Sequence, residues 1–121
     1  RGIYIKTNSD RGGYVKDLYF SNIALGKVED CIYMTANYHG EGGGLYPSKI
    51  SDILISNVSC ESASNTAIVI EGFPEKKVEN VVLDKITVKS AKNGMTLTNT
   101  QNISVNEIII GDKIGVPSAV K

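Results

Sequence analysis

Apolar and polar residues alternate along most of this chain, which is the spacing of a strand with one buried face. Four eleven-residue segments repeat one such pattern, beginning at residues 15, 50, 78 and 100. In each segment positions four, six, nine and eleven are apolar, so the alternation slips by one residue between positions six and nine. The slip predicts that the chain turns a corner there while its apolar side stays inward.

The polar positions of the repeat support such corners. Position three is always an acid or an amide: Asp17, Asp52, Asn80 and Asn102. Asn22 and Asn57 precede position nine in the first two segments, and Asn suits a tight bend because its side chain can bond to nearby backbone. A further short apolar strand separates the segments, at residues 32–34, 67–70 and 95–97. Strand, corner and strand in this order are how one coil of a β-helix turns.

We therefore expect an all-β protein, a right-handed parallel β-helix of about four coils. The coils would cover residues 1–37, 49–71, 78–98 and 100–110, with a tail at 111–121, and would stack about 4.8 Å apart. Val, Ile and Thr dominate the apolar segments, which favours strands. An antiparallel β-sandwich is the alternative, but it needs hairpin turns, and Asn93-Gly94 is the one tight turn of that type in the sequence.

The charge balance and the lengths of the apolar runs limit the classes of partner that this chain can bind. The 121 residues include 13 basic and 13 acidic ones, so the formal net charge is zero. Nucleic-acid and membrane-surface partners need a basic excess, so neither is expected. No apolar run reaches the ~20 residues of a membrane span. The chain opens inside a predicted strand at residues 1–6, without an initiating Met, so we expect a piece of a longer protein.

Two cysteines, Cys31 and Cys60, are too few for a disulfide scaffold, and their spacing fits no zinc motif. Free cysteines are among the most often buried residues. We interpret the two as buried thiols, and a single disulfide between them is the alternative.

The opening residues carry a more specific signal. Residues 1–7 read RGIYIKT, RGG follows at 11–13, and the first repeat segment begins at 15. This order resembles the bacterial branch of glycoside hydrolase family 28, the polygalacturonases, which has an Arg-Ile-Lys strand, a loop rich in Arg and Gly, and a strand of the Asn/Asp-Ile-x-Val-x-Asn-Ile type. Lys6 matches the Lys of that motif, and Tyr4 stands at the Arg position. IEGFPE at 70–75 and VENV at 78–81 resemble later coils, so the resemblance covers about residues 1–110.

The resemblance implies an acidic polysaccharide of the pectin or galacturonan type as substrate. Lys6 would supply a point charge for a sugar carboxylate. Tyr4 would stack on a sugar ring or hydrogen-bond to it, without adding charge. Tyr38 resembles the family's substrate-contacting Tyr at the end of the next coil's strand, and Arg11 is a candidate second carboxylate contact. Each of these four predicted binding residues competes with the interpretation of an ordinary exposed side chain.

The family's catalytic motifs are missing from the sequence. Its members are inverting hydrolases, whose acid and base stand about 6.5–9.5 Å apart. The family carries them in Asn-Thr-Asp and Asp-Asp motifs, with a Gly-His-Gly nearby, all before the Arg-Ile-Lys strand. None of these occurs here, and the single His, His39, lies after Lys6. Neighbouring Glu29 and Asp30 would point to opposite faces of a strand. We predict groove residues but no catalytic residue in this chain.

The expected function is the C-terminal portion of a secreted or periplasmic pectin-degrading hydrolase, inactive as a separate chain. The resemblance implies that the parent needs no metal or organic cofactor. A non-catalytic β-helix that binds carbohydrate or mediates adhesion is the alternative, since it keeps the repeat without catalytic carboxylates. A β-helix lyase would need a Ca²⁺ site of clustered Asp and Glu and an Arg base, and the sequence shows no evident cluster of that kind.

Overall fold

Nearly every residue that the computed structural model describes lies in a β-strand. The described residues are 2–8, 14–38, 49–111, 113–114 and 119–120. The strands are β1 (Ile3–Asn8), β2 (Tyr14–Tyr38), β3 (Lys49–Glu71), β4 (Val78–Thr98), β5 (Thr100–Ile110), β6 (Lys113–Ile114) and β7 (Ala119–Val120). β2, β3 and β4 run for 25, 23 and 21 residues, because each continues round the corners of its coil.

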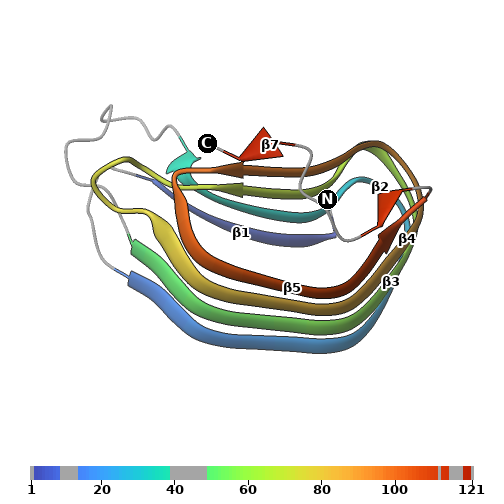
Figure 1. The fold of residues 1–121 in the computed structure, drawn as a ribbon, viewed down its shortest axis with the longest axis horizontal. Helices are drawn as coiled ribbons and strands as arrows, with labels where there is room; N and C mark the ends of the chain where they lie inside the picture. Colours follow the sequence, from blue (N-terminus) through green and yellow to red (C-terminus); the bar gives the residue numbers. More distant parts are fainter. Residues whose placement is uncertain (1, 9–13, 39–48, 112, 115–118, 121) are drawn as a thin grey trace.

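The long strands stack in parallel and in sequence order. β1 pairs with β2, β2 with β3, β3 with β4 and β4 with β5, all in parallel, and Figure 1 shows β2 to β5 as nested curves. The register aligns equivalent repeat positions: Ile23 pairs with Val58, Val58 with Ile86, and Ile86 with Ile108. This stacking confirms the predicted parallel β-helix over the antiparallel β-sandwich.

Each coil bends at two positions of the repeat where the backbone is left-handed. Position three (Asp17, Asp52, Asn80 and Asn102) has φ of 57° or 58°, and position eight (Asn22, Asn57, Lys85 and Glu107) has φ between 53° and 57°. Asp and Asn adopt this backbone more readily than other non-glycine residues. The predicted bends at Asn22 and Asn57 are confirmed. The structure also has a bend at position three, which explains why that position is always an acid or an amide.

The bends divide each coil into three stretches, which we call walls. The first wall lies between the two bends and consists of residues 18–20, 53–55, 81–83 and 103–105. The second wall follows position eight and consists of residues 23–27, 58–62, 86–90 and 108–110. The third wall consists of residues 3–6, 32–35, 68–71 and 95–98.

Aliphatic side chains from all three walls fill the interior. Ile55, Leu83, Ile86, Ile68 and Met95 are among its fully buried members. Because paired residues occupy the same repeat position, the core consists of aliphatic columns that run from coil to coil. Each large aliphatic side chain buried in this way contributes about 1.5–3 kcal/mol.

A disulfide crosses the interior between two coils. Cys31 of β2 is bonded to Cys60 of β3, and both are buried. Our interpretation of two free thiols is therefore wrong, and the alternative of a single disulfide is correct. The bond joins the residue before the third wall of one coil to the second wall of the next.

Asp30 holds the chain where it enters the third wall. Its side chain is fully buried, and its Oδ1 accepts hydrogen bonds from the backbone N–H of Thr66 and from Nδ2 of Asn65, both at 3.1 Å. Glu29 is exposed, so these neighbouring carboxylates point to opposite faces, as predicted. Asp30 is thus bound to Asn65 and Thr66 of the next coil.

The two ends of the stack are less buried than its middle. Residues 14–28 of β2 pair with β3 alone among the described strands, and Phe20 and Ile23 there are only partly buried. Ile103 and Val105 in β5 are partly buried as well. The tail at 111–121, for which the sequence predicts no strand, supplies β6, antiparallel to β5, and β7, parallel to β4. Within the described ranges, no helix has the length and apolar character needed to cross a membrane.

Candidate functional site

The outer side of the third wall carries two of the residues from the opening motif. Ile3 and Ile5 of β1 are buried in the core, so the alternating Tyr4 and Lys6 point outward, and both are exposed. Tyr4 pairs in register with Tyr33 of β2, and Lys6 pairs with Thr35. The period of two and the parallel register thus place a cation and two aromatic rings on one outer surface.

An aromatic pair borders the Lys6 ammonium. The rings of Tyr4 and Tyr33 meet edge to face, with centroids 5.4 Å apart and an angle of 81° between the planes. Nζ of Lys6 lies 5.6 Å from the centroid of the Tyr4 ring, within the range of a cation–π interaction. The Tyr4 ring therefore helps to position the Lys6 ammonium.

A carboxylate closes the other side of this cluster. The hydroxyl of Tyr33 donates a hydrogen bond to Oε1 of Glu71 at 2.8 Å. Glu71 of β3 pairs with Thr35, which in turn pairs with Lys6. Lys6 and Glu71 therefore stand in one row across the wall, two strands or about 10 Å apart at the spacing of parallel strands. The cluster of Tyr4, Lys6, Tyr33 and Glu71 is the candidate site, which we call the third-wall cluster.

Sequence reasoning missed Tyr33 and Glu71. Each occupies an outward position of its strand, and the alternation alone could have marked both as outward. Their contacts depend on which residues of neighbouring coils stand side by side, and that register is seen only once the coils are stacked.

The other predicted binding residues are described less completely. Tyr38 is the last residue of β2 and pairs with Asn8 of β1, two residues beyond Lys6. Its side chain lies outside the described part of the chain, as do Arg11 and His39. Tyr38 and Arg11 as substrate contacts therefore stay predictions.

The chemistry of the third-wall cluster suits binding more than bond cleavage. Lys6 offers a positive point charge, the tyrosine rings offer apolar faces and edges, and the Glu71 carboxylate is engaged by a hydroxyl. Among the residues that the structure describes, no group of three or more His, Cys, Asp or Glu side chains gathers in a way that would hold a metal ion. The cluster can recognise a ligand that carries both an anionic group and a ring.

Comparison with known proteins gives a family. The family model for glycosyl hydrolases family 28 matches residues 1–108. A Vitis vinifera protein described as "Probable polygalacturonase" is 31% identical over 111 residues, which cover 85% of this chain but 22% of that protein. No solved structure matches significantly. The bacterial branch stays a prediction, since the relative found is a plant protein. With the family model covering most of a parallel β-helix, the chain belongs to glycoside hydrolase family 28.

Proposed function

We propose that this chain is the C-terminal portion of a pectin-degrading glycoside hydrolase and forms part of the groove that holds an acidic polysaccharide. The parent protein would hydrolyse α-linked galacturonate chains with inversion, using an acid and a base that this chain does not supply. The observation that carries the proposal is the outward Lys6, held beside the Tyr4 ring on the third wall of a family 28 β-helix.

Lys6 would bind one sugar carboxylate. A galacturonate polymer carries one carboxylate per sugar, so its groove needs fixed cations, and a Lys ammonium is a compact point charge for this purpose. The contact with Tyr4 restricts where the ammonium can go, which lowers the entropy lost on binding. Tyr4 and Tyr33 would add an apolar surface for the sugar ring.

Glu71 and Lys6 give the two ends of the third-wall cluster opposite charges. Its carboxylate repels a sugar carboxylate, whereas Lys6 attracts one about 10 Å away. A substrate chain on this wall is therefore favoured in the position that puts a carboxylate at Lys6 and hydroxyls at Glu71. The pair would select the register of the polymer as well as its charge.

The parent protein is proposed to be secreted or periplasmic. The Cys31–Cys60 disulfide supports this location, because disulfides persist in oxidising compartments and are rare in the reducing cytosol.

The test of this proposal is the full-length protein with Lys6→Met, assayed on polygalacturonate. We expect kcat/KM to fall about 10- to 100-fold, because a hydrogen bond to a charged group contributes roughly 1.5–3 kcal/mol. Lys16→Met is the matched control, since Nζ of Lys16 lies 5.8 Å from the Tyr14 ring centroid in a similar contact away from the third wall. On fully methyl-esterified pectin, which lacks the carboxylates, kcat/KM should be the same for the Lys6→Met variant and the unsubstituted full-length protein.

Two results would contradict the proposal. Equal losses for Lys6→Met and Lys16→Met would mean that Lys6 has no special place in the groove. A full-length protein that binds polygalacturonate but never cleaves it would favour the alternative, a non-catalytic carbohydrate-binding or adhesion module.

A further inference from the structure

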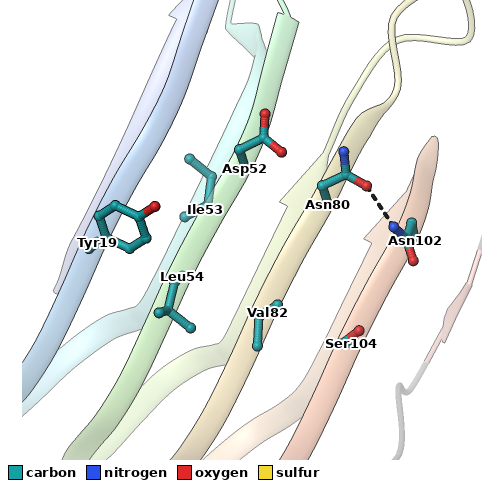
Figure 2. A pocket seen from close by; sticks show the side chains of 8 residues that line it. All are labelled: Tyr19, Asp52, Ile53, Leu54, Asn80, Val82, Asn102 and Ser104. Carbon is teal, nitrogen blue, oxygen red and sulfur yellow. Dashed lines mark hydrogen bonds between the residues drawn. The ribbon is translucent and has the colours of Figure 1, made fainter.

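A hollow lies on the outer side of the first wall, away from the third-wall cluster. Its volume is about 420 Å³, and Figure 2 shows side chains from four neighbouring strands around it. The hollow is lined by Tyr19, Asp52, Ile53, Leu54, Asn80, Val82, Asn102 and Ser104. Neither Lys6 nor Tyr4 lines this hollow, so the hollow needs its own explanation.

An apolar row runs along one side of the hollow. Tyr19, Leu54, Val82 and Ser104 pair in register, one on each of β2 to β5. Tyr19 is 74% exposed and Val82 is 40% exposed. Single exposed apolar residues are ordinary, but here the first three stand side by side on successive strands, and an exposed apolar patch of this kind marks a contact surface.

A polar row runs beside it at position three of the repeat. Asp52, Asn80 and Asn102 occupy this row, and their left-handed backbone is shared from coil to coil. Nδ2 of Asn102 donates to Oδ1 of Asn80 at 2.6 Å (Figure 2), and Oγ of Ser51 donates to Oδ2 of Asp52 at 3.2 Å. An amide has two donor hydrogens and a carbonyl with two lone pairs, so these bonds use only part of the hydrogen-bonding capacity of the row.

The one charge that lines the hollow is opposite in sign to that of Lys6. Asp52 is the one charged residue among the eight described residues that line it. A chain of uronic acids would bring a negative group towards this carboxylate with no lining cation to compensate. The ligand that fits is uncharged, with an apolar face for Tyr19 and with hydroxyl groups for the carboxylate and amides.

We propose that this hollow binds an uncharged polysaccharide chain that runs across the strands, parallel to the stack of coils. The C–H faces of its sugar rings would lie over Tyr19, Leu54 and Val82, and its hydroxyls would bond to Asp52, Asn80 and Asn102. Successive strands repeat every 4.8 Å or so, which is close to the length of one extended sugar unit. β3 and β4 would each therefore present one apolar and one polar side chain to a sugar, through Leu54 with Asp52 and Val82 with Asn80.

This site goes beyond the proposed hydrolysis of an acidic polymer and does not depend on it. The hollow and the third-wall cluster lie on different walls and share no residue. A hydrolase with both surfaces would hold an acidic chain on the third wall and an uncharged chain on the first wall.

The experiment is calorimetric titration of the full-length protein with six-unit oligosaccharides of galactose, glucose and mannose, and with hexagalacturonate. We expect at least one uncharged oligosaccharide to bind, and Tyr19→Ala to weaken it tenfold or more. Val82→Ser, which copies the Ser104 position in the same row, should weaken it in the same direction. Tyr14→Ala is the matched control, because Tyr14 is 76% exposed but lies outside the hollow, and it should leave the affinity unchanged.

Three outcomes would overturn the proposal. They are the failure of all three uncharged oligosaccharides to bind, an equal loss with Tyr14→Ala and Tyr19→Ala, and a loss of hexagalacturonate affinity in Tyr19→Ala. Hydrolysis of polygalacturonate should be unchanged in Tyr19→Ala, whereas Lys6→Met should impair hydrolysis and spare binding of the uncharged chain. Failure of this site and failure of the proposed function are therefore distinguishable.

Discussion

At the scale of single residues, the bends of the coil place the strictest requirement on backbone conformation. Asn22 and Asn57 tolerate the left-handed backbone at position eight, but Lys85 and Glu107 adopt it too, with φ of 56° and 55°. An ordinary L-residue in this conformation costs about 1–2 kcal/mol. The column at position eight therefore contains two favourable and two strained members.

Replacing Lys85 by Asn should stabilise the protein. The expected gain in the free energy of unfolding is up to about 1 kcal/mol, because Asn accepts the left-handed backbone more easily. The new amide would also stand next to Asn57, whose Nδ2 already donates to Oδ1 of Asn22 at 2.5 Å. Chemical denaturation measures the change. Lys89→Asn, at an exposed strand position, is the control, and the explanation fails if it stabilises as much as Lys85→Asn.

At the scale of elements, one glycine sets how β3 ends beside the third-wall cluster. Gly72 directly follows Glu71, and its N–H donates to the Thr98 carbonyl at 2.8 Å. A Cβ atom on Gly72 would lie 2.6 Å from the carbonyl oxygen of Asn99 and 2.7 Å from the backbone nitrogen of Val78. Backbone atoms of the next coil thus leave no space for a side chain there.

We expect Gly72→Ala to lower the free energy of unfolding by about 1–3 kcal/mol, as overpacking of a tight site does. Gly26→Ala is the matched control, because a Cβ there meets nothing within 4 Å. Ala in place of Gly inside a strand should be neutral or stabilise by roughly 0.5–1 kcal/mol. The unfolding midpoint should therefore fall for Gly72→Ala and stay or rise for Gly26→Ala. An equal fall in both variants would argue against the close approach at Gly72.

At the scale of the whole molecule, stability comes from the contact of each coil with its neighbours. The strands pair with strands one coil away, in sequence order. Such a stack behaves as a nearly one-dimensional array, in which a bond between two coils restrains both. The Cys31–Cys60 disulfide is a covalent bond of this kind, with a sequence separation of 29.

Reduction of this disulfide should destabilise the whole stack. A crosslink that closes a loop of this length contributes about 3–4 kcal/mol by restricting the unfolded chain. Guanidinium unfolding with and without a reductant measures the difference. A Cys31→Ala/Cys60→Ala variant should unfold at the same guanidinium concentration as the reduced protein, with or without the reductant. Equal unfolding midpoints for the oxidised and reduced protein would show that the disulfide does not stabilise the stack.

The sequence predicted the coils well because their signals are local. The alternation of apolar residues gave the strands, and Asn22 and Asn57 gave one of the two bends. The contacts between coils were not predictable in this way. The edge-to-face pair of Tyr4 and Tyr33, the hydrogen bond to Glu71 and the disulfide all depend on which residues of neighbouring coils stand side by side.

Two other features lacked a chemical signal in the sequence. Lys85 and Glu107 follow the bend of their neighbours in the column, although neither residue type favours it. The short strands β6 and β7, of two residues each, are too brief for any periodicity to appear. Neighbouring coils impose the conformation in both cases.

The one-coil separation between paired strands also sets the order in which the strands can fold. During synthesis, β2 emerges before β3 and β3 before β4, so each new strand finds its partner already made. Folding can then follow translation from the first coil to the last. The cost of this order is that the newest strand always presents a row of unpaired N–H and C=O groups, and it remains open to pairing with another nascent chain until the next coil covers it.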